Sequence, residues 1–429
     1  MIFPYKHNRM IINDVRVLIL LFPIWWILGI EQFIWVFSLL IIFIKMLIFK
    51  KGEFRLSPIH LIFLTFLCSV LLSIINIDLP IRYITFFKNL CSFVSVWLSL
   101  VIVHNSLYDW SELLKLLRTL TYVILFSAIV GVINFFFPSS RIEITSLISF
   151  FIPNSLLSTS FGSILAVRNF GAMDNFIILG QYFRVNSLFL FATMFASILA
   201  LSIPFLIFFK KISVGFWNNI FYNFAILITI LALVFTTGRV AIFSLIIGLI
   251  YFRFFIRPDK VIKIIYLYIF VFILIVIIVA FTQNPLLLDF ANMILNSRGE
   301  GSKMTRIQIY INSIESLKQH FIIGWGTQRD VPGMYYPLGS HSFYLGILYK
   351  HGILGLSSFL YFLALAWKKI KVNHMKHSND EILILLNYGR VMMFVLLING
   401  ITDEFDLDST VMFFLGLFIA ILLKASDLY

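Results

Sequence analysis

The residues best suited to chemistry lie in one polar stretch, residues 284–341, of an otherwise strongly apolar chain. This stretch carries Arg298 and Arg306 and closes on His341. Guanidinium groups stay protonated and bind phosphate through paired hydrogen bonds. An imidazole titrates near neutral pH and can take a proton from a hydroxyl group. Because polar chain between membrane helices commonly carries function, we expect the functional site here.

The elements that must position these residues are membrane helices. Hydrophobic residues make up 61% of the 429 positions, charged residues make up 12%, and the mean hydropathy is +0.99. Soluble domains carry roughly 25% charged residues. The apolar runs recur at the ~20-residue length that crosses ~30 Å of hydrocarbon. We therefore expect an all-α polytopic membrane protein in which residues 1–429 form a single transmembrane domain.

Twelve membrane spans are predicted, with both termini on the same side. They cover about residues 16–30, 33–49, 57–76, 84–103, 118–137, 185–209, 218–236, 239–256, 261–282, 340–366, 382–402 and 408–424. Most Lys and Arg residues fall in the short loops and tail on the side of the N-terminus. Short cytoplasmic loops are enriched in these residues, so both termini are expected in the cytoplasm. The net charge of +13 is then a sign of membrane topology and not of nucleic-acid binding.

Two long segments are expected outside the cytoplasm. Residues 138–184 mix polar positions with short apolar runs and should lie along the membrane interface. Residues 284–341 form the large loop, with an amphipathic helix at about 303–320, because apolar residues recur there every three or four positions. These are Met304, Ile307, Ile311, Ile314 and Leu317; Arg306, Tyr310 and Ser313 share the more polar side.

Several kinds of chemistry lack support in the sequence. Cys68 and Cys91 both fall in apolar runs, which argues against disulfides, cysteine-ligated metals and a thiol nucleophile. The chain has no phosphate-binding loop or zinc-hydrolase motif. The acidic hairpin Asp403–Asp408 has weak metal-site character and is expected to be a solvated turn. No metal, nucleotide or other cofactor is therefore expected.

Short motifs between residues 182 and 360 resemble those of the bacterial O-antigen polymerases and O-antigen ligases. In that family, an arginine opens an amphipathic helix in a large external loop, a Gly-x-Gly turn follows, and a histidine begins the next span. The matching positions here are Arg306, Gly324-Trp325-Gly326 and His341. Two upstream arginines, Arg184 and Arg239, resemble the family's arginines at the outer ends of spans. Ser342 stands where the family often has Asn, and Lys350 is basic where relatives are acidic or variable.

The resemblance implies a fold like the membrane-embedded C-type glycosyltransferases and a site facing the periplasm from the inner membrane. It also implies that donor and acceptor are glycans on polyprenyl pyrophosphate, with His341, Arg306 and Arg239 as the catalytic set. Arg184, Arg298 and Lys350 would help to bind pyrophosphate, and Tyr310 and Trp325 would contact the glycan. Membrane lipids and a chain-length-regulating protein are expected partners, and nucleic acid is not.

Three functions stay open at this point. A polymerase would extend the glycan by one lipid-linked repeat at a time, and this is favoured because polymerases vary widely in sequence. A ligase would deliver the glycan to lipid A–core. A flippase or exporter would need charged residues along a cavity that reaches both membrane faces, whereas the candidates here gather on the outer face.

Structural explanations also compete with the functional ones. Arg184 and Arg239 could contact lipid phosphates from the ends of spans. Arg306 could be a solvated helix charge, and His341 could be an interfacial structural residue. Lys350, His351 and Arg390 lie within spans, where a charge costs at least ~2.5 kcal/mol, so they could contact carrier phosphate or one could pair with an acid such as Glu381. Lys350 and His351 fall about ten residues into their span, which favours a structural or water-cavity role for them. Lys88 is expected to meet anionic lipid headgroups, and the Gly324–Gly326 turn is expected to be structural.

Overall fold

The protein is almost entirely helical in the computed structural model, which describes residues 3–50, 54–136, 143–151, 162, 166–169, 184–256, 300–334, 336–371 and 380–429. The long helices are α1 (Phe3–Leu20), α2 (Phe22–Leu28), α3 (Ile34–Lys50), α4 (Pro58–Leu72), α5 (Pro80–Ser106), α6 (Trp110–Phe136), α9 (Ala192–Ile212), α10 (Phe216–Phe235), α11 (Arg239–Phe255), α14 (Glu300–Leu317), α15 (Phe343–Ile370), α16 (Asp380–Asn399) and α17 (Ser409–Leu428). Short helical turns are η1 (Ser73–Asn76), η2 (Leu147–Phe150) and η3 (Phe405–Leu407). Strands β1 (Glu143–Thr145) and β2 (Val167–Asn169) pair in antiparallel fashion.

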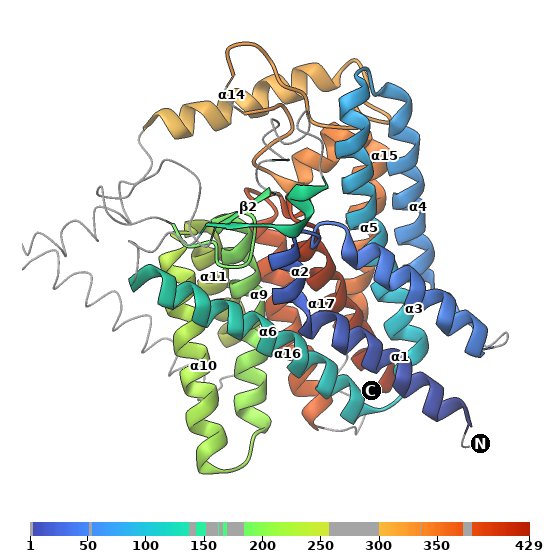
Figure 1. The fold of residues 1–429 in the computed structure, drawn as a ribbon, viewed down its shortest axis with the longest axis vertical. Coiled ribbons are helices and arrows are strands. Elements are labelled where there is room, and N and C mark those ends of the chain that lie inside the picture. The colour runs from blue at the N-terminus through green and yellow to red at the C-terminus, as the bar shows by residue number, and fades with distance from the viewer. Residues whose placement is uncertain are drawn as a thin grey trace, which may run out of the picture.

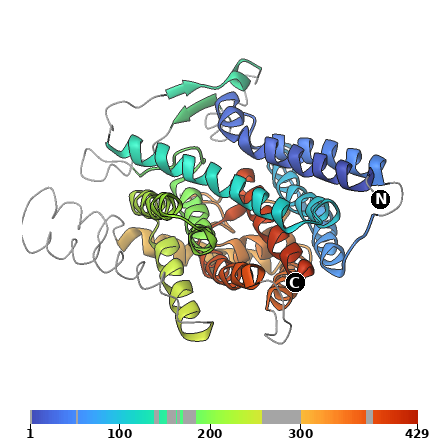
Figure 2. The ribbon, with the colours of Figure 1, turned by 90° about the horizontal axis from the view of Figure 1, so that it is seen from below.

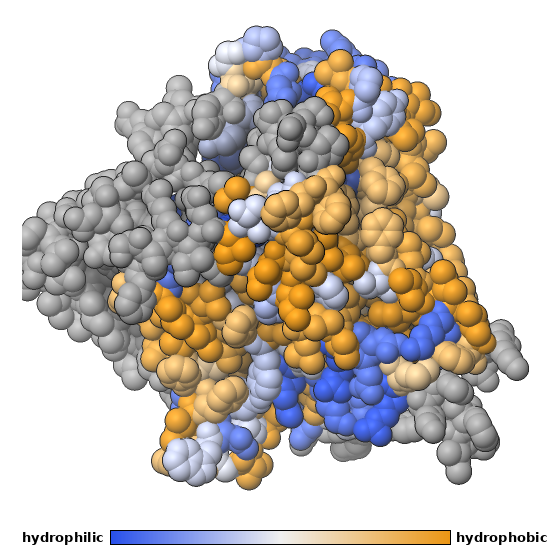
Figure 3. Space-filling view, viewed as in Figure 1, coloured by the Kyte–Doolittle hydropathy of each residue, from blue (hydrophilic) through white to orange (hydrophobic). Residues whose placement is uncertain are grey.

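In the described part of the chain, eight helices are long and apolar enough to cross a membrane, or nine if the bent pair α1–α2 forms one span. The expectation of an all-α polytopic membrane protein is therefore confirmed. The count of twelve spans remains a prediction, because the span expected at 261–282 lies outside the described residues. Hydrophobic side chains cover the middle of the molecular face in Figure 3, and hydrophilic ones gather toward its lower end.

The helices are arranged around α9 and α17, which are the most completely buried of the spans. α17 packs against α5, and α9 packs against α10 and α16 (Figure 1). α1 and α6 lie side by side along one flank of this bundle, with the β1–β2 pair at the same edge (Figure 2). Both termini lie at the lower end in Figure 1, and α14 lies across the opposite end.

Two predicted spans differ from the structure for local reasons. The first predicted span is broken into α1 and α2, which meet at an angle of 50°. Pro23 lies in the first turn of α2 and cannot donate a main-chain hydrogen bond there. The span predicted to begin at 185 instead begins at Ala192. The Asn186 side chain donates to the Phe189 carbonyl at 2.9 Å and Ser187 has φ +50°, so residues 185–191 turn before α9 starts.

α15 contains a break at Gly352 (φ +66°), and the loop preceding α15 supplies the hydrogen bonds that the break leaves open. The amides of Trp325 and Gly326 donate to the carbonyls of Tyr349 and Lys350 at 2.9 and 2.7 Å. After the break, the amide of Ile353 donates to Phe321 at 2.9 Å. The Gly-x-Gly turn is thus a structural element that packs against the break in α15, as expected from the sequence.

Candidate functional site

Arg184 contacts the tight turn between α10 and α11, and Arg239 follows directly after that turn. The Arg184 guanidinium donates through Nε to the carbonyl of Thr236 at 3.0 Å, and the Val185 amide donates to Phe235 at 3.2 Å. Arg239 begins α11 two residues after Thr237, which has φ +53°. Arg184 is buried, whereas Arg239 is exposed at the end of the bundle. The turn therefore brings two of the expected phosphate-binding residues together.

α14 turns Tyr310 and Ser313 toward the rest of the protein, together with the buried Ile309 and Leu317. The Tyr310 hydroxyl donates to the carbonyl of His341 at 2.8 Å, and the Ser313 hydroxyl accepts from the Gly339 amide at 2.8 Å. Ile307, Ile311 and Ile314 are about half exposed on the opposite side. Since Tyr310 follows Arg306 by one helical turn, α14 places Arg306 on the side of His341.

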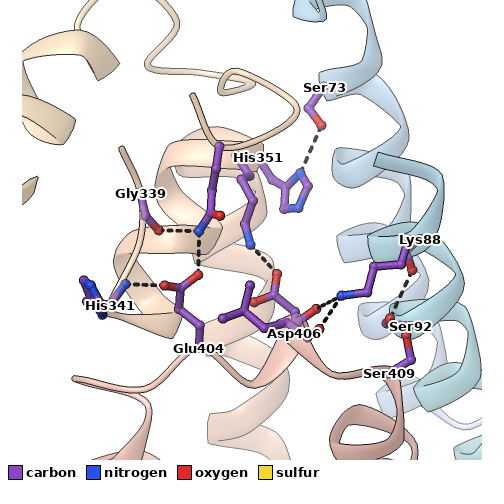
Figure 4. Close-up of polar contacts among 12 residues, drawn as sticks. Ser73, Lys88, Ser92, Gly339, His341, His351, Glu404, Asp406 and Ser409 are labelled. Carbon is purple, nitrogen blue, oxygen red and sulfur yellow. Dashed lines mark hydrogen bonds and ion pairs between the residues drawn. The ribbon is translucent and has the colours of Figure 1, made fainter. Parts of the chain in front are cut away.

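His341 is held at both of its main-chain polar groups. Its amide donates to the Glu404 carboxylate (Figure 4). Its carbonyl accepts from the Tyr310 hydroxyl. Its φ is +64°, a conformation unusual for a residue with a Cβ. The imidazole packs edge-on against the ring of Tyr336, with centroids 4.5 Å apart. Ser342 caps α15 by accepting from the Leu345 amide at 3.3 Å, and Asn would serve the same role, which accounts for the departure from the family's motif.

The acidic hairpin at 403–408 was expected to be a solvated turn, and that expectation is wrong. Asp403, Glu404, Asp406 and Asp408 are between 1% and 8% exposed. Each meets a donor from another element, because unpaired charges are costly to bury. Asp403 accepts from Ser197 at 3.1 Å, and Asp408 accepts from Gln32 at 3.1 Å and from the Leu190 amide at 3.2 Å.

Asp406 is the partner of Lys350, in place of the Glu381 suggested above. The two side chains form an ion pair in which both are almost fully buried. Lys88 was expected to face lipid headgroups, and this is also wrong. It is buried and donates to the carbonyls of Asp406, at 3.1 Å, and Leu407 (Figure 4). Glu381 instead accepts from Trp110 at 2.9 Å.

The two central acids of the hairpin have opposite pKa shifts. Burial raises the pKa of Glu404 to about 7, although the positive charge of Lys350 and the hydrogen bonds from His341 and Gln328 oppose this. Burial also opposes ionisation of Asp406, but the charge and hydrogen bond of Lys350 outweigh it and hold the pKa of Asp406 below its ordinary value. Glu404 can therefore exchange a proton near neutral pH, while Asp406 stays ionised.

Trp325 is a packed residue in this structure. The Arg329 guanidinium lies 3.5 Å from its ring centroid, and the His320 ring lies 4.0 Å away. Its indole N–H donates to the Ser316 carbonyl at 3.2 Å, and the residue is 7% exposed. A sugar could stack on this ring only if Arg329 moved.

Residues 224–360 match the family model described as O-antigen ligase. The expected resemblance to the O-antigen polymerase and ligase family is thereby confirmed over this segment. The O-antigen ligase segment runs from within α10 to within α15 and contains the turn at Arg239, α14, the Gly-x-Gly turn and His341. No curated protein matches the chain.

The structure brings some of the predicted site residues together and leaves others apart. Tyr310 and His341 are in contact, and Arg184 and Arg239 share one turn. Packing connects these two groups. Gly238 in the turn lies against Ala196 of α9. The next residue of α9, Ser197, donates to Asp403, which precedes Glu404 in the hairpin. Arg298 lies outside the described residues.

The burial of the hairpin and its pairing with Lys350 and Lys88 were not predicted from the sequence, although a signal was present. Lys350 and Lys88 lie in predicted spans and need nearby anions, and the hairpin joins two spans with four acidic residues. Within the described ranges, no three His, Cys, Asp or Glu residues group as a metal site.

Proposed function

We propose that the protein is an inner-membrane glycosyltransferase of bacterial surface-polysaccharide assembly, with a polyprenyl-pyrophosphate-linked glycan as donor. The observation that carries this proposal is the Tyr310–His341 contact within the O-antigen ligase segment. It joins α14, which bears Arg306, to the start of α15, 31 residues further along the chain. His341 as a base and Arg306 as a phosphate-binding cation would then act on the same bound substrate.

In the proposed reaction, an acceptor sugar hydroxyl gives its proton to His341 while its oxygen attacks the anomeric carbon of the donor. The bond from that carbon to the phosphate oxygen breaks, and polyprenyl pyrophosphate leaves with the bonding electrons. Arg306 and Arg239, supported by Arg184, would stabilise the charge that develops on the phosphates. Because pyrophosphate is already a good leaving group, the reaction needs no nucleotide.

The preferred acceptor is the terminal sugar of the next lipid-linked repeat, which makes the protein a polymerase. The chain matches the family's motifs loosely, as polymerases do. A ligase that delivers glycan to lipid A–core is the second candidate, because the family model that matches residues 224–360 does not separate ligases from polymerases. In both cases we place the termini in the cytoplasm, the site on the periplasmic side and the fold among the C-type glycosyltransferases.

The decisive experiment deletes the gene in its host and separates surface and lipid-linked glycans on a gel. Loss of the ladder, with single repeats left on lipid A–core, would support the polymerase. Full-length chains stranded on the carrier would mean a ligase, and repeats trapped on the cytoplasmic side would mean a transporter. Complementation with Arg306→Ala or His341→Ala should fail, whereas Lys318→Ala, at an exposed cation directly after α14, should restore the wild-type pattern.

A further inference from the structure

We propose that Gln328 and Glu404 are positioning residues that together set the orientation of His341. The proposal rests on the proposed function, because it takes His341 as the group that acts on the acceptor hydroxyl. It assigns a role to Glu404, which contacts the main chain of His341, and to Gln328, which contacts Glu404 and the main chain of Gly339.

The first support is the main-chain conformation of His341. Its φ of +64° is disfavoured for a residue with a side chain, so contacts outside the residue must hold it. Glu404 supplies one such contact by accepting from the His341 amide. Glu404 is 4% exposed, so water cannot readily replace its carboxylate if the side chain is lost.

The second support is the position of the Gln328 amide. Its Nε2 donates both to the Glu404 carboxylate and to the carbonyl of Gly339, the latter at 3.2 Å. Gln328 therefore connects the carboxylate that holds His341 to the residue two positions before it. The two side chains form a bracket around residues 339–341, and Tyr310 closes its other side at the His341 carbonyl.

The main-chain conformation of His341 also affects the position of its imidazole. The φ and ψ of a residue set the direction of its Cα–Cβ bond and restrict its rotamers, so a relaxed main chain would move the His341 ring from its present place beside Tyr336. Misplacement of a reacting group by about 1 Å can cost roughly 10²-fold in rate. The bracket should therefore act on turnover more than on substrate binding.

The test uses the full-length protein in detergent or vesicles, with synthetic polyprenyl-pyrophosphate-linked repeats as donor and acceptor. We expect Gln328→Ala to lower kcat by about 10- to 100-fold with little change in the KM for donor. Gln328→Glu should lose at least as much, because it places a second carboxylate against Glu404. Gln308→Ala is the matched control, since Gln308 is exposed on α14 and its side chain bonds only one turn away, to Asn312.

A double-mutant cycle separates positioning from simple loss of structure. If Gln328 acts through His341, Gln328→Ala should cause no further loss in the His341→Ala background, measured as residual turnover above membranes that lack the protein. An equal further loss in that background would overturn the inference and leave the proposed function standing. Wild-type activity of His341→Ala alone would overturn the assignment of His341 instead. Glu404→Gln keeps the side-chain volume and one hydrogen-bond acceptor, so it provides a folded variant should Gln328→Ala unfold. We expect an intermediate loss of kcat in Glu404→Gln. Unchanged kcat in this variant would also overturn the inference.

Discussion

The ammonium group of Lys350 and the carboxylate of Asp406 form an ion pair inside the helical bundle, with side chains only 2% and 1% exposed. Lys350 immediately precedes the residues at which α15 breaks, and Asp406 lies in the hairpin whose Glu404 holds His341. The pair thus ties the broken helix to the hairpin. Its burial makes each charge depend on the other, and this leads to the first prediction.

Lys350→Met should lower the free energy of unfolding by about 3–5 kcal/mol, because it leaves the buried Asp406 charge without its partner. The double variant Lys350→Met/Asp406→Leu should recover much of this loss, since no buried charge of the pair then remains. Chemical unfolding in detergent micelles would measure both. Lys45→Met is the matched control: Lys45 pairs with Asp14 at 2.5 Å, but both side chains are about one-third exposed, so less than about 1 kcal/mol is expected. A single Lys350→Met variant as stable as the wild type would contradict the prediction.

Gly352→Ala should prevent the Gly-x-Gly turn from docking on α15. A Cβ at Gly352 would lie 2.2 Å from the carbonyl oxygen of Ile322, and that oxygen belongs to rigid main chain. Gly333→Ala is the control, since Gly333 has a similar positive φ of +83° but open space around it. That control isolates the left-handed strain, about 1–2 kcal/mol, from the clash. We expect Gly352→Ala to reduce the folded yield in membranes sharply and Gly333→Ala to leave it near wild type. Equal yields would show that the contact with Ile322 does not matter.

Trp325→Ala should act on stability. The ring is covered by Arg329 and His320, so its loss should cost about 3–5 kcal/mol, as for other buried tryptophans. Thermal unfolding and the KM for lipid-linked glycan should be measured on the same preparation. A variant with wild-type stability and a raised KM would instead support the sugar-stacking role proposed from the sequence.

The contribution of Glu404 and Glu31 to stability should fall as the pH rises from about 4.5 to about 7. The pKa values of Glu404 and Glu31 are both raised from 4.5 to about 7, chiefly by burial, so the folded protein holds these protons more tightly than the unfolded chain. The stabilisation is complete below the unfolded pKa and is lost as the pH passes through the folded pKa. Each group could account for a loss on the order of 3 kcal/mol.

Glu404→Gln removes one of these two groups, so the change in the free energy of unfolding from about pH 5 to about pH 8 should be less negative in Glu404→Gln than in the wild type, by up to about 3 kcal/mol. Glu315→Gln, on the exposed side of α14, should keep the wild-type dependence. An unchanged dependence in Glu404→Gln would show that this carboxyl does not titrate in the window.

Much of the helical framework could be predicted because a membrane span has a simple signal. Residues 218–236 and 382–402 were expected as spans, and α10 and α16 cover nearly the same residues. The helix expected at about 303–320 corresponds to α14, but its packing was not predictable. Apolar periodicity shows that a helix has two unlike faces, whereas the bonds of Tyr310 and Ser313 and the burial of Ile309 and Leu317 show which face turns inward.

The sequence by itself determined a helical membrane protein whose residues 224–360 match the O-antigen ligase family model, because span length, residue charge and short motifs are local properties of the chain. Only the tertiary structure decided where the charges of the spans and loops find partners. Lys350 and Asp406 are separated by 56 residues, and Gln328 and Glu404 by 76. Buried charges are stable only beside their partners, and which partners meet depends on how the helices pack.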